Sequence, residues 1–414
     1  MNRPIRPAGS PTASHRRRMR LAVALVTLAA SGSALADEPP RFALSGFGTL
    51  GIVRSDKDNY RFHSSSTQSG NTRGQDFDAS ADSVLGLQGT GRIDDRLDLT
   101  VQAISRQAVG YNYTPHVTWA YLHYRATPNL SVRAGRTTTP FFMFSDSLNV
   151  NYATPWLRPS VEVYSLNPFT DLDGIDFLYR IPMGEMDMEL QGVFGQSAVS
   201  ARSASSRLKN VRGIRVGAAG SGFSGQVGYT RTQMHLQWND IGYQALHDLL
   251  VATGDAAGLA ALSGNDSNAE FFSAGFQWEK NNWVSIAEFV KRRVGRYISS
   301  SHAWYVTLGY RFDTLTPYLT YSQQHEDQPA FAASVNPALA PVVGLFNNSR
   351  NTAQQTTALG LRWDAARNIA IKGQLERVTP APSGRGMFSS DQAADYLKPA
   401  TPATVLSLSL DFVF

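Results

Sequence analysis

Hydrophobic and polar residues alternate in short blocks along most of the chain after residue 41. Residues 404–414 read Thr-Val-Leu-Ser-Leu-Ser-Leu-Asp-Phe-Val-Phe, so leucines and phenylalanines share one face and serines and an aspartate share the other. Because side chains of a strand point alternately to its two faces, this pattern predicts a half-apolar strand. Similar blocks predict sixteen strands, at about 42–54, 83–92, 97–106, 115–125, 129–136, 174–181, 186–195, 211–219, 223–233, 270–279, 283–293, 302–312, 317–324, 353–364, 368–377 and 403–414.

The connections between these blocks alternate between short and long. The short ones lie at 93–96, 126–129, 181–184, 220–222, 280–282, 313–316 and 365–368, and the long polar ones at about 55–82, 107–114, 137–173, 196–210, 234–269, 294–301, 325–352 and 378–402. A β-sandwich would also alternate, but it would rarely sort its connections so strictly. The pattern predicts an all-β fold, a transmembrane antiparallel up-and-down β-barrel of about 16 strands with long loops at one rim.

One long connection breaks the strand pattern. Between residues 242 and 262, Tyr243, Leu246, Leu249 and Leu250 follow helical spacing. We expect a short helix inside an outer loop, with a packing role.

The amino-terminal segment has the features of an export signal. Arg16–Arg20 is basic, Leu21–Ala30 is apolar, and Ala34-Leu-Ala36 provides small residues for cleavage. The apolar run is too short for a membrane-spanning anchor, the alternative interpretation. We therefore predict a cleaved signal peptide over residues 1–36 and a barrel domain over 37–414, with translation starting at Met1 or Met19.

Removal of this segment changes the charge of the chain. The full sequence has 38 basic and 33 acidic residues, but six arginines and no acids lie in residues 1–36. The remaining 32 basic and 33 acidic residues carry a net charge of −1, which gives no reason to expect a nucleic-acid partner.

The composition excludes several other classes of protein. The absence of cysteine argues against a thiol enzyme or a disulfide scaffold and suits export through an oxidising compartment. The mean hydropathy is −0.24, and no run of about 18 apolar residues follows the signal segment, which argues against a helical membrane protein. A membrane β-barrel is compatible with this low mean hydropathy, because apolar and polar residues alternate along its strands.

The chain has few motifs that could carry catalysis or bind a cofactor. Gly46-Phe-Gly-Thr-Leu-Gly51 matches the dinucleotide fingerprint, but it lies inside a predicted strand and no helix follows it. The histidines are scattered without metal-ligand spacing, and no Ser-His pair stands out. We expect no cofactor, no metal and no enzymatic activity.

The third long connection, residues 137–173, is unusual for an exposed loop. It has seven aromatic residues: Phe141, Phe142, Phe144, Tyr152, Trp156, Tyr164 and Phe169. It also carries four acids: Asp146, Glu162, Asp171 and Asp173. Such a loop either folds into the barrel or contacts a neighbouring subunit.

Five segments together resemble the sixteen-stranded, trimeric Gram-negative porin family. They are Ser45–Gly51, Ala120–Arg136, Gly309–Phe312, Thr316–Tyr321 and the terminal Phe414, and the resemblance covers nearly all of residues 41–414. It implies an outer-membrane channel for passive diffusion of small hydrophilic solutes and ions. It also implies a homotrimer in contact with outer-membrane lipid and lipopolysaccharide, and recognition of Phe414 by the barrel assembly machinery.

The resemblance further implies that the loop after the fifth strand folds inward and narrows the channel. Its candidate acids are Asp146, Glu162, Asp171 and Asp173, facing candidate wall residues Arg92, Gln102, Arg106, Thr118 and Arg133. The loop lacks the family's common Pro-Glu-Phe-Gly-Gly run and has Pro155-Trp-Leu-Arg-Pro159 instead. The solute, the pore radius and the preference for anions or cations stay open.

Three alternatives share the barrel but differ in function. A substrate-selective channel would use the aromatic third loop as a stacking surface. An outer-membrane enzyme would need a Ser/His pair at the outer rim. A structural barrel would have a plugged lumen and would not conduct.

Overall fold

The computed structural model describes residues 41–57, 60–68, 76–109, 112–201, 204–264, 267–296, 298–331, 336–389 and 400–414. The predicted signal segment lies outside these residues. The strands belong to one unit, Arg41–Val413.

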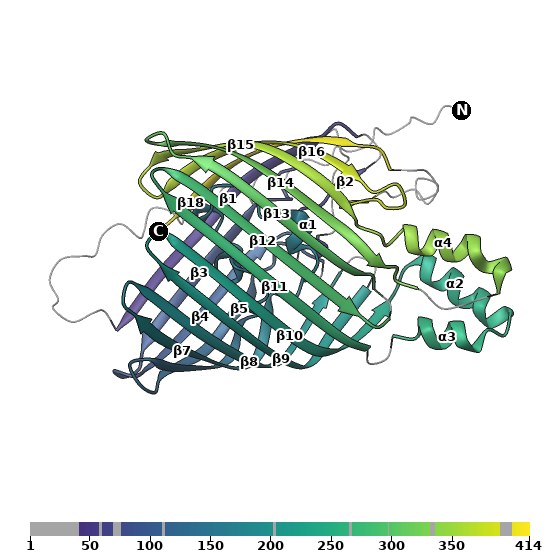
Figure 1. The fold of residues 1–414 in the computed structure, drawn as a ribbon, viewed down its shortest axis with the longest axis horizontal. Coiled ribbons are helices and arrows are strands. Elements are labelled where there is room, and N and C mark those ends of the chain that lie inside the picture. Colours follow the sequence, from purple (N-terminus) through teal and green to yellow (C-terminus); the bar gives the residue numbers. More distant parts are fainter. Residues whose placement is uncertain are drawn as a thin grey trace, which may run out of the picture. The chain divides into compact units, whose positions relative to one another are not determined.

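The predicted sixteen-stranded antiparallel barrel is confirmed (Figure 1). Each strand pairs with its neighbours along the chain, and β18 pairs with β1 to close the sheet. The barrel strands are β1 Phe42–Ser55, β3 Val84–Arg92, β4 Leu97–Arg106, β5 His116–Arg125, β6 Leu130–Thr138, β7 Asp171–Met183, β8 Met186–Ser200, β9 Ala204–Gly220, β10 Phe223–Trp238, β11 Ser267–Lys280, β12 Trp283–Val294, β13 Ser300–Tyr310, β14 Leu315–Gln328, β15 Gln354–Ala366, β16 Ile369–Pro380 and β18 Ala403–Val413.

The alternation in the last strand has the expected orientation. Leu406 and Leu408 are 46% and 47% exposed on the outer surface, whereas Ser407 and Asp411 are 1% and 0% exposed on the inner side. An outward apolar face and an inward polar face are what a membrane barrel requires.

Several strands extend further at the long-loop rim than the pattern predicts. β9 begins at Ala204 rather than near 211, and β10 ends at Trp238 rather than near 233. In the added part of β9, Leu208 is buried inside the barrel while Arg207 and Lys209 are exposed outside. Polar residues therefore face outward and apolar residues inward in this part of β9, the reverse of the pattern in the rest of the barrel. Because of its polar residues, the sequence pattern predicts a loop here.

The short turns use residues that accept a left-handed backbone. Asn281 and Asn282 have φ of 51° and 69°, and Ser221 and Gly222 have φ of 53° and 79°. Positive φ at both central residues is the requirement of two-residue hairpins whose twist matches the strands.

The Gly46–Gly51 motif lies within β1, as expected. A Cβ atom on Gly48 would lie 2.4 Å from the ring of Phe412, so this glycine allows close packing across β1 and β18.

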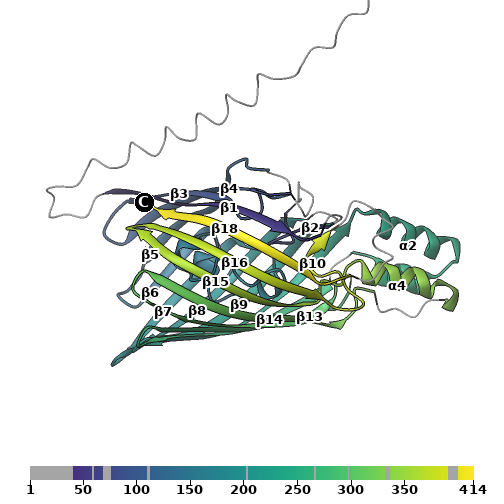
Figure 2. The same ribbon diagram turned by 90° about the horizontal axis from the view of Figure 1, so that it is seen from above.

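The long loops contain further elements. β2 Arg61–Phe62 pairs with β17 Phe388–Ser389 in a small separate sheet. The expected helix is two helices, α2 Ile241–Ala252 and α3 Ala256–Leu262. A further pair, η3 Pro337–Leu339 and α4 Ala340–Asn348, was not predicted, and α4 lies beside α2 (Figure 2). Among the described residues, no helix has the length and apolarity needed to cross a bilayer.

Candidate functional site

The third loop, residues 139–170 between β6 and β7, is folded into the barrel as predicted. It contains three short helical turns, η1 Ser145–Ser147, η2 Asn151–Ala153 and α1 Val161–Tyr164. Six of its apolar side chains are 4% exposed or less: Phe141, Phe142, Trp156, Leu157, Val163 and Leu166. Burial of this many apolar groups explains why the loop leaves the solvent.

A buried arginine fastens the loop to the barrel. The Arg158 guanidinium forms two hydrogen bonds with Asp82, of 2.9 and 2.6 Å, and pairs with Glu376 of β16. It also donates to Ser407 of β18. Burial opposes the charge of Arg158, but the carboxylates of Asp82 and Glu376 outweigh it, so its pKa is raised above the usual range.

Further polar contacts join the loop to the same side of the barrel. Glu162 accepts hydrogen bonds from Ser322 of β14 at 2.7 Å and from Gln354 of β15 at 2.6 Å. Lys372 of β16 donates to the carbonyl oxygen of Trp156 at 2.9 Å and pairs with Asp411 at 3.0 Å. We call this side the charged wall; its inward-facing residues are Thr49, Ser322, Gln354, Thr356, Arg362, Lys372, Glu376, Ser407 and Asp411.

The opposite face of the loop packs on an apolar surface. Phe271 of β11 lies edge-on to Phe141 and Phe142, with ring centroids 5.2 and 5.5 Å apart, and Tyr305 of β13 lies 5.7 Å from Trp156. We call this side the apolar wall; it is formed by the buried residues Leu208, Val211, Met234, Leu236, Ala269, Phe271, Val284, Ile286, Val290, Val294, Ala303 and Tyr305 of β9–β13.

One carboxylate, that of Glu288, lies within the apolar wall and accepts three hydrogen bonds. Glu288 of β12 accepts from the Met143 backbone N–H at 3.0 Å and from the Tyr305 hydroxyl at 2.8 Å. The Tyr164 hydroxyl donates to it at 2.5 Å. These bonds join both ends of the loop to one strand.

A cavity of about 100 Å³ lies between the third loop, residues near Ser64 and Asp82, and the facing ends of β3 and β4. Its lining includes Arg106 of β4, whose guanidinium donates to the Asn149 amide oxygen of the loop at 3.1 Å. Asp146 is exposed on the loop. Of the nine predicted residues, Arg106 alone is among the described residues that line this cavity.

Two other predicted wall residues lie close together on neighbouring strands. Thr118 of β5 donates to Gln102 of β4 at 3.0 Å, and Gln102 donates to Gln88 of β3 at 2.9 Å. Arg133 is itself paired with Asp176 through bonds of 2.9 and 2.6 Å.

Three further predicted residues, Glu162, Asp171 and Arg92, have their contacts elsewhere in the barrel. Glu162 is 2% exposed and bonded to the charged wall. Asp171 contacts His116 at 3.1 Å. Arg92 is exposed at the short-turn end of β3, opposite Asp98.

Asp173 has a different orientation from the one expected of a pore acid. It pairs with Arg136 at 2.6 Å and shares the outward face of β7 with Ile175, which is 54% exposed. Whether any of the nine residues influences ion passage stays a prediction.

The sequence prediction missed the residues that hold the loop, namely Arg158, Asp82, Glu376 and Lys372. Arg158 stands in the Pro155–Pro159 run that departs from the family pattern. Lys372 and Glu376 alternate with outward Ile371 and Leu375. Both signals were present in the sequence. Within the described residues, no three His, Cys, Asp or Glu side chains form a group that could hold a metal ion.

Comparisons with known proteins agree with this architecture. The outer membrane channel DcaP of Acinetobacter baumannii matches with a TM-score of 0.56 at 14% identity, over 92% of this chain and 100% of its own. An anion-selective porin from Comamonas acidovorans matches with a TM-score of 0.52 at 12% identity, over 90% and 99%. The OmpT protein of Vibrio cholerae, in a trimer form, matches with a TM-score of 0.50 at 10% identity, over 91% and 100%.

At these identities the solved structures support the fold alone. No curated protein matches the chain at a significant level. The model of one family, described as Gram-negative porin, matches residues 22–380. The match covers most of the chain, and the chain therefore belongs to the Gram-negative porin family.

Proposed function

We propose that the chain forms a water-filled outer-membrane channel in which the third loop sets the narrowest point for passive diffusion of small hydrophilic solutes and ions. The observation that carries this proposal is the position of the loop. It is fastened to the charged wall through Arg158 and packed on the apolar wall through Phe271, so the space lined by Arg106 of β4 and Asn149 of the loop is left for solutes.

Passage requires no chemical step, and charge and size at the constriction decide which solutes pass. Asp146 on the loop is exposed and Arg106 on the wall lines this space, so the two carry opposite charges. Salt screens charges over about 8–10 Å at physiological ionic strength, so groups beside a narrow passage act on every ion within it. A field between the two signs favours polar solutes over apolar ones.

Membership of the porin family and the trimer form of the Vibrio cholerae protein support assembly as a homotrimer. The exposed apolar residues of the outer face, such as Leu406 and Leu408, would contact outer-membrane lipid and lipopolysaccharide. We further infer removal of residues 1–36 during export and recognition of Phe414 by the barrel assembly machinery.

Conductance of the purified protein tests the channel itself. Reconstitution into planar bilayers should give stepwise increases in current with a linear voltage dependence, and liposomes should swell in small sugars faster than in large ones. A folded, membrane-inserted protein that gives no current steps would instead support a plugged structural barrel.

A further inference from the structure

A second cavity, of about 250 Å³, lies inside the barrel between the end of the third loop and the inner face of β9–β12. The loop contributes Phe141 and the segment Ser165–Phe169, and the strands contribute Leu208, Met234, Leu236, Ala269 and Phe271. Aryl- and alkyl-sized ligands fit such a volume, since a dry cavity of about 150 Å³ already binds benzene.

The chemistry of this cavity is opposite to that of a wet pore wall. The inward residues of β9–β11 that line it are mostly apolar, and the outward residues beside them are polar or charged, among them Arg207, Lys209 and Arg231. Glu270 of β11 also lines the cavity. In a barrel built only for hydrophilic diffusion, inward positions are polar. The inverted alternation therefore places a concave apolar surface where solutes enter from the long-loop rim.

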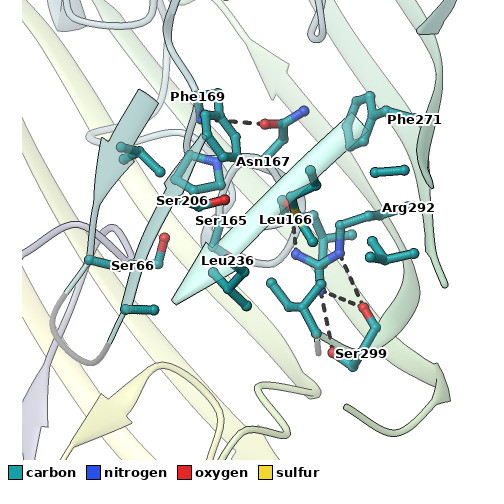
Figure 3. Close-up of a pocket in the computed structure, with 18 of the residues that line it drawn as sticks. Ser66, Ser165, Leu166, Asn167, Phe169, Ser206, Leu236, Phe271, Arg292 and Ser299 are labelled. Atoms are coloured by element: carbon teal, nitrogen blue, oxygen red, sulfur yellow. Dashed lines mark hydrogen bonds between the residues drawn. The ribbon is translucent and has the colours of Figure 1, made fainter. Parts of the chain in front are cut away.

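The guanidinium of Arg292 projects into this apolar surface (Figure 3). Arg292 of β12 donates from Nη1 to the Leu166 carbonyl oxygen at 2.7 Å and from Nη2 to the Ser299 carbonyl oxygen at 2.8 Å. Its Nε also donates to that Ser299 carbonyl at 3.2 Å, and Nη2 to the Ser299 hydroxyl at 3.3 Å. In Figure 3 it lies between Leu166 and Ser299, with the rings of Phe169 and Phe271 on the side away from Ser299. Among the described residues, no carboxylate lies within ion-pair distance of Arg292.

We propose that this cavity binds a small amphipathic anion, with an aryl or alkyl body against Phe169, Phe271 and Leu236 and a carboxylate at Arg292. Nε and Nη2 are bonded to Ser299, so the carboxylate would accept from the second hydrogen of Nη1. Such a charge-assisted bond is about twice as strong as a neutral one. In an apolar setting the pairing gains further, because water competes less for both charges. This assigns a substrate class to the proposed channel and depends on channel function only for delivery of the solute.

Other charged groups near the cavity shape the expected affinity. Glu326 of β14 is the carboxylate whose charge reaches Arg292, and its Oε1 atom is buried without a hydrogen-bond partner. It should weaken binding of an anion. Arg350 also lines the cavity, but it pairs with Asp240 at 2.6 Å and stacks over Phe346. Its charge is already compensated.

The test measures binding to the purified full-length protein by isothermal titration calorimetry, separately from conductance. The probes are phenylacetate, which has both the aromatic ring and the carboxylate, phenylethanol, which has the ring without the charge, and acetate, which has the charge without the ring. Phenylacetate should bind saturably, phenylethanol about tenfold more weakly, and acetate without saturation. Binding without conductance would refute only the channel, and conductance without binding of phenylacetate would refute only this site.

Four variants make the assignment specific. Arg292→Gln should weaken phenylacetate about tenfold and leave phenylethanol unchanged, whereas Glu326→Gln should tighten phenylacetate. Ala269→Leu should weaken both aromatic probes by filling the cavity. Arg293→Gln is the matched control, because Arg293 is the next residue of β12 and lies exposed on its outer face. Equal affinity for both aromatic probes, or equal effects at positions 292 and 293, would overturn the proposal.

Discussion

The two walls that hold the third loop differ in how they hold it. On the charged wall, Arg158, Lys372 and Glu162 form directed hydrogen bonds to buried partners. On the apolar wall, where Glu288 is the hydrogen-bonded exception, Phe141, Phe142 and Trp156 make ring contacts that have no fixed bonding direction. Directed bonds fix the position of a loop, and apolar packing stabilises it over a range of small displacements.

This difference has consequences for function. We expect the charged wall to fix the position of the loop, because loss of one partner leaves the other charge buried and unpaired. The apolar wall can lose a contact and repack, and it also leaves the cavity beside Arg292. We therefore expect substitutions on the two walls to affect stability and conductance unequally.

The largest effect is expected for Arg158→Met. Removal of the guanidinium leaves Asp82 and Glu376 buried without their cation, at a cost of about 3–5 kcal/mol in the free energy of unfolding. The loop should then move away from the charged wall, and single-channel conductance should become larger and more variable. Urea unfolding and single-channel recording measure the two effects.

Arg180→Met is the matched control for this substitution. Arg180 also faces a carboxylate, Glu189 at 3.5 Å, but its side chain is 72% exposed. Exposed ion pairs contribute about 0–1 kcal/mol. Similar losses at positions 158 and 180 would show that the buried network does not hold the loop.

A smaller effect is expected for Phe271→Leu on the apolar wall. The substitution removes two aromatic pairs, with Phe141 and Phe142, worth about 1–3 kcal/mol together. Leucine refills much of the space, so unit conductance should stay close to that of the native protein. A change in conductance as large as that of Arg158→Met would remove the distinction between the walls.

The smallest effect on stability is expected for Asp146→Asn, which lies on the side of the loop that touches neither wall. An exposed substitution changes the free energy of unfolding by about 0.5 kcal/mol or less. Loss of the negative charge should shift the zero-current reversal potential in a salt gradient toward anion preference. Asp327→Asn is the control, since Asp327 is exposed and pairs with His302 at 2.6 Å; an equal shift there would contradict a role for position 146.

Much of the barrel could be predicted from alternation alone. In β18, for example, outward residues face lipid and are apolar, whereas inward residues face a polar interior. Leu406 and Ser407 follow this pattern. The prediction of strand ends was wrong where outward residues are polar and inward residues are apolar. Near Leu208 of β9 the outside is polar and the inside packs on the loop, so the ends of β9 and β10 were read as loops.

The site was only partly predictable for a related reason. The aromatic content of residues 137–173 indicated a buried loop, because such residues need a surface to pack on. The partners of Arg158 come from residues 82, 376 and 407, far apart in the sequence. Alternation predicts whether a side chain points into or out of the barrel, but not its height along the barrel axis. These contacts could therefore be identified only once the register between strands was known.

The most direct test of the central claim, that the third loop narrows the channel, uses the absence of cysteine from the chain. Cysteine is introduced at position 146 on the loop or at position 327 on the outer face, and a sulfonated methanethiosulfonate reagent is added during single-channel recording. Because the added group would stand in the passage, Asp146→Cys should lose conductance in discrete steps while Asp327→Cys should not change. No change at 146, or equal changes at both positions, would show that the third loop does not narrow the channel.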